Sequence, residues 1–301
     1  MAIPGIAMDR SKNSARFWLP TPVLIIALLV GQVAHARDPQ KPSSSGKDEK
    51  GLLRIDTAMF DVAAATGGDF YFWAPGEFAT STLEIAIKGE PLLLAYGEAK
   101  PLVTEELPIP IDSQMTRLDV FVGAQQLDMA SLIRPDGTSV RDGEEHVKIQ
   151  KYQHMMIYAI DAPPPGQWHL ELAAEGRRAV TAHGGSQGED GIELSNFDFV
   201  EFQGRPGHQR MMPVEGPLPG GAGLRCRLRL SGDWSTARFA FVGLSGAPIA
   251  ELDLRRLSGS EFSGKCEVPM EPFRVLARGR DANGIDFQRL IATSRMSARP
   301  Q

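Results

Sequence analysis

The apolar positions of this sequence follow two different periods, and the change falls near residue 90. Before it, apolar residues recur at helical spacing until a glycine pair ends the pattern, as seen at Ile55, Met59, Val62, Ala63 and then Gly67 and Gly68. The aromatic run Asp69–Trp73 predicts a strand, and Ser81–Lys88 predicts a second helix. Residues 51–90 therefore predict a short α–β–α segment, too small to form its own core and obliged to pack on another unit.

From residue 91 the period changes to two. In Leu118–Val122 and Trp168–Leu172 apolar and polar residues alternate, as in antiparallel strands with one buried face. Clusters of Pro, Gly and Asp separate such runs. The first series of predicted strands comprises Pro91–Tyr96, Leu107–Ile111, Arg117–Val122, Ala130–Ile133, His146–Gln150, His154–Ile160, Trp168–Leu172, Ala179–Ala182 and Phe197–Phe202.

A second series follows a glycine-containing boundary at Gly204–Gly207. It comprises Met211–Val214, Arg225–Leu230, Arg238–Val242, Ile249–Leu254, Lys265–Val268, Phe273–Arg278 and Phe287–Ala292. Many short strands in roughly ninety residues are typical of an immunoglobulin-like sandwich. The sequence thus predicts a mainly β chain with two tandem antiparallel β-sandwich (immunoglobulin-like) domains, residues 91–205 and residues 206–301, preceded by the short α–β–α segment.

The two cysteines, Cys226 and Cys266, fall on strands that would be neighbours in one sheet of the second sandwich. In an oxidising compartment an even pair is more often a disulfide than a reactive site. We therefore predict a Cys226–Cys266 disulfide. The alternative is two separate buried thiols.

The N-terminus has the pattern of a secretory signal over residues 1–36. Basic residues precede the apolar run Val23–Val30, and Ala34–Ala36 has the small-x-small form of a cleavage site. The run is shorter than the ~20 residues of a spanning helix, so an uncleaved anchor is the weaker alternative and no membrane insertion is expected after cleavage. Residues 37–50 are polar and predict a disordered linker. The expected location is secreted or periplasmic.

The net charge of the chain argues against nucleic acid as a partner. The formal net charge is −5, and removal of three basic residues and one acidic residue with the signal would make it −7. A mildly acidic chain without basic clusters is a poor candidate for nucleic acid. An extracellular or periplasmic protein is the expected partner, and carbohydrate is the alternative.

Several segments together resemble a known family. The run Leu107–Asp112 (LPIPID), the spacing Leu132-x-x-Pro135-x-Gly137 and the later Pro165-Gly166-x-Trp168 resemble the domain that follows the von Willebrand factor A domain in hemicentins and in von Willebrand factor A domain-containing protein 7. The stretch Val268–Val275 is similar to the immunoglobulin-like domain that comes next. The resemblance implies a β-sandwich fold and a general extracellular interaction role.

The upstream run Phe60–Tyr71 (FDVAAATGGDFY) resembles the last helix and strand of a von Willebrand factor A domain. That domain carries its metal site on a D-x-S-x-S loop, and no such pentapeptide occurs in this sequence. Metal-dependent adhesion is therefore not part of what the resemblance implies, and the expectation is no metal and no cofactor.

Motifs that suggest catalysis lack the context that catalysis requires. Gly184–Gly188 satisfies G-x-S-x-G around Ser186, with His183 beside it, but a nucleophile elbow needs a helix after the serine and a strand-like segment follows instead. None of the mature chain's histidines forms a close metal-binding pair. Asp281 begins a fragment of a calcium loop whose terminal glutamate is missing, and Asn283-Gly284 favours a hairpin turn.

We therefore expect a non-enzymatic module for protein interaction or assembly. The alternative is a glycan-binding module in which Tyr71 and Trp73, from the aromatic run, stack on sugar rings; burial of that run in a core is the competing interpretation. A hydrolase using Ser186 is the third and weakest hypothesis.

Overall fold

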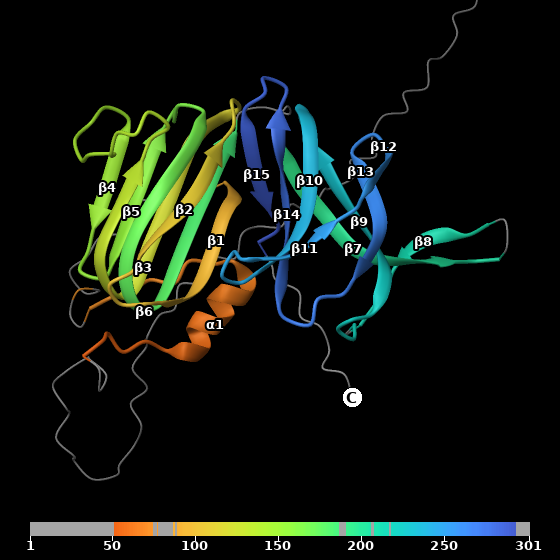
Figure 1. The fold of residues 1–301 in the computed structure, drawn as a ribbon, viewed down its shortest axis with the longest axis horizontal. Coiled ribbons are helices and arrows are strands. Elements are labelled where there is room, and N and C mark those ends of the chain that lie inside the picture. The colour runs from red at the N-terminus through yellow and green to blue at the C-terminus, as the bar shows by residue number, and fades with distance from the viewer. Residues whose placement is uncertain are drawn as a thin grey trace, which may run out of the picture.

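The computed structural model describes residues 51–74, 77, 87, 89–186, 191–205, 208–216 and 218–292. The expected signal peptide (1–36) and linker (37–50) lie outside the described residues, as does the expected helix Ser81–Lys88 except for Ile87. Two antiparallel β units stand side by side in the described part (Figure 1), which confirms the mainly β, tandem architecture.

The first unit contains six strands in one hydrogen-bonded sheet of order β1-β6-β3-β5-β4, with β2 also paired to β6. Their bounds are β1 Glu90–Ala99, β2 Thr104–Ile111, β3 Met115–Ile133, β4 Val147–Lys151, β5 Met155–Asp161 and β6 Gly166–Ser186. Four of the predicted strands merge into two long ones, because β3 and β6 each run through a segment expected to be a turn or loop.

Bulges allow these long strands to curl around a core. The pairing of β3 with β6 shifts register between Ala124 and Gln126 and again between Leu127 and Met129. A bulge bends the strand and increases its twist. The concave side of the sheet thereby closes on one apolar cluster that draws residues from both halves of β6, including Trp168 and Val180, both 0% exposed.

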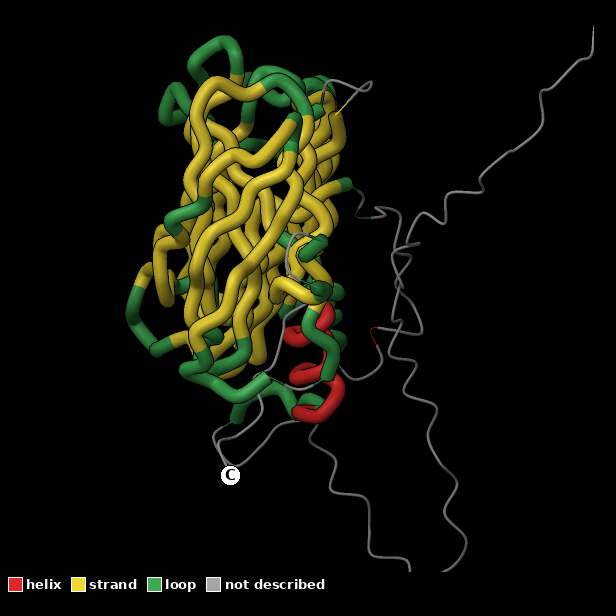
Figure 2. The backbone as a smooth tube through the Cα atoms, turned by 90° about the vertical axis from the view of Figure 1, so that its right-hand side faces the viewer, coloured by secondary structure: helices red, strands yellow, loops and turns green. Residues whose placement is uncertain are grey.

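The segment before β1 covers the other face of this sheet. Helix α1 (Thr57–Thr66) begins at Asp56, whose carboxylate accepts the N–H groups of Ala58 and Met59, and it ends at Gly67 in a left-handed conformation with φ 73°. Figure 2 shows α1 outside the strand layers, at one end of the molecule. The expectation that this piece packs on another unit is met, since Phe60 joins a cluster with residues of β1, β3, β5 and β6.

The prediction that Asp69–Trp73 forms a strand is wrong. This run has no ladder partner in the described chain and crosses the sheet as an extended segment. Phe70 and Phe72 are buried against the sheet and against Phe60, with ring centroids 5.1–6.3 Å apart. The alternating burial of its side chains reflects packing on a sheet face and not backbone pairing.

The second unit is a sandwich of a four-stranded sheet, β11-β10-β14-β15, and a five-stranded sheet, β12-β13-β9-β7-β8. The bounds are β7 Glu193–Gln203, β8 Arg210–Pro213, β9 Gly223–Ser231, β10 Trp234–Gly243, β11 Pro248–Leu252, β12 Arg255–Ser258, β13 Glu261–Glu267, β14 Phe273–Asp281 and β15 Asp286–Leu290. Its core is rich in phenylalanine, with Phe241 and Phe273 centroids 4.7 Å apart.

The boundary between the units lies earlier than the expected 205/206. Strand β7, placed in the first sandwich by the sequence prediction, pairs with β8 and β9 of the second. Phe197 and Phe199 of β7 meet Phe241 and Phe273 in edge-on or tilted contacts, so the apolar face of β7 belongs to the second core. The change of unit therefore occurs between Ser186 and Ile192.

Candidate binding groove between the two units

The two units meet along an edge that a buried ion pair holds together. Strands β1 and β2, both paired to β6, lie next to β15 of the second unit (Figure 1). From β15, Arg289 Nη2 donates to Asp112 Oδ2 at 2.7 Å, and the two side chains are 1% and 0% exposed. Arg289 Nε also donates to the Ile192 carbonyl at 2.7 Å. Such a pair is costly to break, because either partner alone would be an uncompensated buried charge.

A second carboxylate shares the same guanidinium. Glu90 Oε2 lies 3.0 Å from Arg289 Nε, and its side chain is 36% exposed. Burial raises the pKa of Glu90 to about 7, even though Arg289 opposes the shift. One buried cation therefore faces two acids, and the more exposed one retains a proton at mildly acidic pH.

Hydrogen bonds to the carboxylate of Asp281 also join the two units. Asp281 Oδ2 accepts the hydroxyl and the backbone N–H of Ser113 at 2.6 and 3.0 Å, while Oδ1 accepts the N–H groups of Asn283 and Ile285. Burial works against ionisation, but these hydrogen bonds outweigh it and lower the pKa of Asp281. The fragment that resembles a calcium loop is thus a hairpin turn whose aspartate links the two units.

Arg274 of β14 ties α1 to both units. This arginine is 1% exposed and donates to the backbone carbonyls of Ala64, Leu244 and Ala292. Its guanidinium carbon also lies 5.3 Å from the centroid of the Tyr96 ring in β1. The backbone N–H of Tyr96 in turn donates to the Leu244 carbonyl at 2.9 Å. These contacts fix the helix, the first sheet and the second sandwich as one body.

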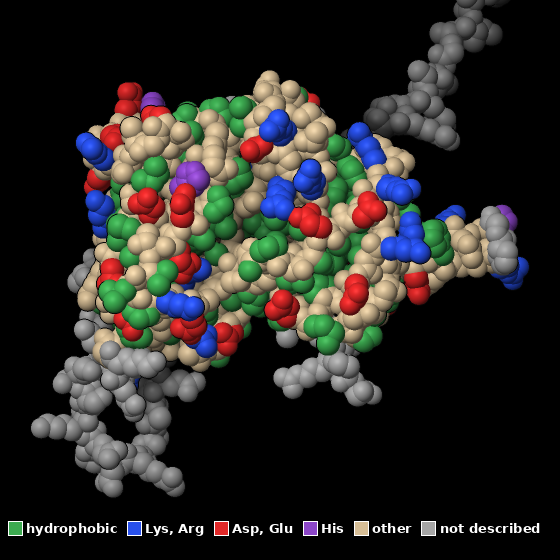
Figure 3. Space-filling model, viewed as in Figure 1, with side chains coloured by type: hydrophobic (Ala, Val, Ile, Leu, Met, Phe, Trp, Pro, Cys, Tyr) green, Lys and Arg blue, Asp and Glu red, His purple; other side chains and the backbone are tan. Residues whose placement is uncertain are grey.

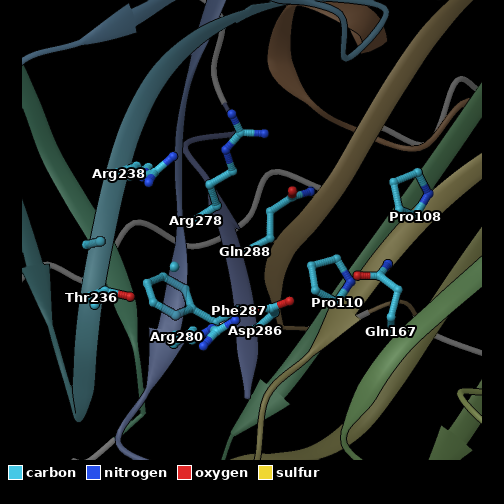
Figure 4. A pocket seen from close by; sticks show the side chains of 12 residues that line it. Pro108, Pro110, Gln167, Thr236, Arg238, Arg278, Arg280, Asp286, Phe287 and Gln288 are labelled. Carbon is cyan, nitrogen blue, oxygen red and sulfur yellow. Dashed lines mark hydrogen bonds and ion pairs between the residues drawn. The ribbon is translucent and has the colours of Figure 1, made fainter. Parts of the chain in front are cut away.

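A groove of about 670 Å³ opens on the surface beside this junction, and both units line it. The lining side chains seen in Figure 4 come from β2 (Pro108 and Pro110), β6 (Gln167), β10 (Thr236 and Arg238), β14 (Arg278 and Arg280) and β15 (Asp286, Phe287 and Gln288). Ligand pockets commonly measure ~300–1,000 Å³. Because the junction is held by buried contacts, the groove is formed before any ligand arrives.

Three arginines, Arg238, Arg278 and Arg280, form what we term the arginine stripe of this groove. Arg238 of β10 stands directly opposite Arg278 of β14. Arg280 lies two residues along β14, on the same face as Arg278. Figure 3 shows basic side chains gathered near the middle of this face, close to where the two units meet.

The acids that accompany the stripe are exposed. Arg278 Nη2 lies 2.5 Å from Glu251 Oε1, with side chains 51% and 59% exposed. Arg280 Nε lies 3.4 Å from Asp286 Oδ1, with side chains 65% and 61% exposed. Exposed pairs of this kind contribute little stability and exchange partners readily. The stripe is therefore an accessible basic surface on an otherwise acidic chain.

The predicted binding aromatics lie elsewhere, on the face covered by the N-terminal segment. The rings of Tyr71 and Trp73 are stacked, with centroids 6.3 Å apart and an interplanar angle of 20°, and both are partly buried. Tyr71 also meets Phe121 edge-on at 5.4 Å, and Trp73 meets Tyr152 at 5.1 Å. Burial raises the pKa of Tyr71. Tyr71 and Trp73 therefore lie at the half-buried edge of a packed cluster, in a segment that does not line the groove.

The predicted disulfide is absent from the structure, in which Cys226 and Cys266 are free thiols. Their strands are neighbours as expected, but Cys226 stands opposite Gly264, and Cys266 stands opposite Leu224. The cysteines thus occupy diagonal and not directly opposed positions on one face. A hydrogen bond with Cys226, together with burial, raises the pKa of the Cys266 thiol, so it is a poor nucleophile.

The G-x-S-x-G sequence does not form a catalytic turn within the described residues. Strand β6 continues through Ser186, its last residue. His183 lies three residues earlier on the same strand, so its side chain and that of Ser186 point to opposite faces. His183 instead lies near the half-buried Asp69, whose carboxylate accepts the Thr181 hydroxyl at 2.7 Å. No group of His, Cys, Asp and Glu among the described residues could hold a metal ion.

No helix in the described part of the chain is long and apolar enough to cross a membrane.

Sequence reasoning missed the groove because its residues come from five strands in two units. One local signal was present: Arg278 and Arg280 alternate around Gly279, which places two basic side chains on one strand face. Their position opposite Arg238 depends on strand register, which the sequence does not specify.

Comparison with known proteins identifies the first unit. Residues 93–187 match the family described as hemicentin galactose-binding domain-like. This range runs from β1 to the end of β6, so the hemicentin resemblance is confirmed for the first unit. No curated protein matches the chain.

Two solved structures show distant similarity. One is the titin domains Z1Z2 in complex with telethonin, with 13% identity and a TM-score of 0.20, covering 71% of this chain and 100% of that one. The other is β-1,2-glucanase from Parabacteroides distasonis, with 9% identity and a TM-score of 0.20, covering 71% of this chain and 38% of that one. Scores this low bear on neither fold nor function.

Proposed function

We propose that this chain is an exported, non-enzymatic binding module that holds a partner protein in the groove between its two units. The observation that carries the proposal is the preformed groove, lined by both units beside the Arg289–Asp112 pair. The match of residues 93–187 to the family described as hemicentin galactose-binding domain-like agrees with a binding function. The chain would act outside the cytoplasm, in the secreted or periplasmic fraction, after cleavage following Ala36.

The N-terminal segment supports a finer assignment. The residues of α1 and the run that follows resemble the end of a von Willebrand factor A domain, and they pack on the first unit through Phe60 and Phe72. We place the chain with the region that follows this domain in the von Willebrand factor A domain-containing protein 7-like group. The segment then serves as a fixed cover on the sheet and not as an adhesion site.

Capture from the native exported fraction tests the proposed function. The mature chain, residues 37–301, is used as bait beside Thr236→Trp, which fills the groove from an exposed position, and Ser139→Trp, which adds the same ring at an exposed position that does not line the groove. We expect the wild type and Ser139→Trp to retain one stoichiometric protein that Thr236→Trp loses. Equal recovery by all three baits would show that the partner does not bind in the groove. Recovery of no protein by any bait would refute the proposed function.

A glycan-binding function is the second candidate, because Tyr71 and Trp73 present a stacked and only partly buried pair of rings. Sugar rings stack on such surfaces. Titration with cell-surface polysaccharides should then quench or shift tryptophan fluorescence in the wild type, and Trp73→Ala should abolish the change. A flat titration across a broad panel counts against this candidate.

A further inference from the structure

We infer that the groove selects an acidic, extended segment of its protein partner, whose carboxylates bind the arginine stripe. The inference rests on the proposed function and specifies the chemistry of what the groove holds. It follows from three features of the groove: the arrangement of its like charges, the exchangeability of its acids, and the proline wall opposite the stripe.

Like charges face each other across the stripe. Arg238 and Arg278 occupy directly opposed positions on neighbouring strands, where side chains lie close together. Like charges in that arrangement repel. An anion lying between the two guanidinium groups turns the repulsion into a pair of charge-assisted hydrogen bonds.

The existing counterions are few and replaceable. Glu251 accompanies Arg278 and Asp286 accompanies Arg280, and all four side chains are more than half exposed. The groove thus has three arginines and one acid, with a second acid beside it. By contrast, the arginine that holds the junction is buried with its acid at 1% and 0% exposure. The exposed ion pairs of the stripe can therefore exchange partners, whereas the buried ion pair of the junction is fixed.

The wall opposite the stripe excludes one common mode of peptide binding. Pro108 and Pro110 alternate along β2, so both lie on one face of the strand, and each lacks a backbone N–H. Because β2 pairs with β6 on its other side, its groove-facing edge is poor in donors for strand addition. The prolines offer apolar contact, and Gln167 and Gln288 offer amide groups. Specificity therefore resides in side-chain contacts, chiefly the arginines.

Defined probes test the inference on the mature chain. Binding of an oligoglutamate peptide of about ten residues, ~33 Å when extended, is measured by fluorescence anisotropy beside oligolysine and glycine–serine peptides of equal length and beside polygalacturonate. The test variants are Arg238→Glu/Arg278→Glu and the milder Arg278→Gln. The charge-matched control is Arg141→Glu/Arg255→Glu, whose side chains are exposed and lie outside the groove.

We expect the wild type and the control to bind oligoglutamate and not the glycine–serine peptide. The double reversal should lose about tenfold or more in affinity and bind oligolysine instead, and Arg278→Gln should fall between them. Raising salt from about 0.05 M to about 0.5 M should weaken wild-type binding, because the charges are exposed. Urea unfolding midpoints near the wild-type value confirm that the variants fold.

Two results overturn the inference. One is oligoglutamate binding that is absent from the wild type or unchanged in the double reversal. The other is stripe-dependent binding of polygalacturonate without binding of oligoglutamate, which would make the ligand an anionic polysaccharide. Either result leaves the capture experiment with Thr236→Trp unaffected, so failure of the inference and failure of the proposed function are distinguishable.

Discussion

Replacement of Arg289 by Met should loosen the junction between the two units. The change leaves the carboxylate of Asp112, 0% exposed, accepting the N–H of Gln114 at 3.0 Å but without its charged partner. Breaking a buried ion pair from one side costs ~3–5 kcal/mol. The hydrogen bond to the Ile192 carbonyl is lost as well, worth about 1 kcal/mol. We therefore expect a loss of ~4–6 kcal/mol, a large share of the ~5–15 kcal/mol typical of a folded domain.

Urea unfolding followed by tryptophan fluorescence measures this loss, and each unit contributes tryptophans to the signal. Trp168 lies in the core of the first unit, and Trp234 packs on the core of the second. A loosened junction should split one fluorescence transition into two. The matched control is Arg280→Met, which removes an arginine from an exposed pair with Asp286 and should cost less than about 1 kcal/mol.

A second variant separates lost charge pairing from lost packing. Asp112→Asn added to Arg289→Met removes the stranded charge but retains an oxygen for the Gln114 N–H. The double variant should be more stable than Arg289→Met alone by ~1–3 kcal/mol. The reasoning is refuted if Arg289→Met costs no more than Arg280→Met, or if Asp112→Asn brings no recovery.

Three further predictions concern the same framework. Folding raises the pKa of Glu90 from 4.5 to about 7, so between these pH values the folded chain keeps a proton that the unfolded chain releases. The stability of the wild type should therefore fall as pH rises from 5 to 8, and the urea midpoints of Glu90→Gln should lack that fall. In Gly279→Ala the added Cβ would lie 1.9 Å from the Thr236 carbonyl oxygen, so a loss of ~1–3 kcal/mol or more is expected, whereas Gly223→Ala, with no atom within 4 Å, should be nearly neutral; thermal melts compare them. Phe72→Ala, at 0% exposure, should cost ~3–5 kcal/mol by calorimetry if the N-terminal segment is an integral cover, and a change under about 1 kcal/mol would show that the segment is dispensable.

Local patterns in the sequence predicted the elements well. The run Leu118–Val122 of β3 is buried on both faces, contrary to its predicted polar face, because clusters pack on either side of the sheet. By contrast, the glycine stop at Gly67 marks the end of α1, and the alternation in Trp168–Leu172 marks the buried face of β6. These signals succeed because each depends on neighbouring residues only.

The errors arise where the answer depends on distant partners. The aromatic run Asp69–Trp73 has the composition of a strand, but its rings pack on a sheet without backbone pairing. Phe197 and Phe199 indicate an apolar face without saying which core receives it. Cys226 and Cys266 lie on neighbouring strands, yet their register places them diagonally. The groove was missed for the same reason, since strand register alone brings Arg238 beside Arg278.

Site-specific photo-crosslinking in living cells shows whether a partner protein lies in the groove. A benzophenone amino acid is placed at Thr236, inside the groove, and in a separate chain at Ser139, an exposed position that does not line it. We expect a crosslink to one protein from position 236 and none from position 139. Absence of any crosslink from position 236, or the same product from both positions, would contradict the claim that this chain binds its partner in the groove between its two units.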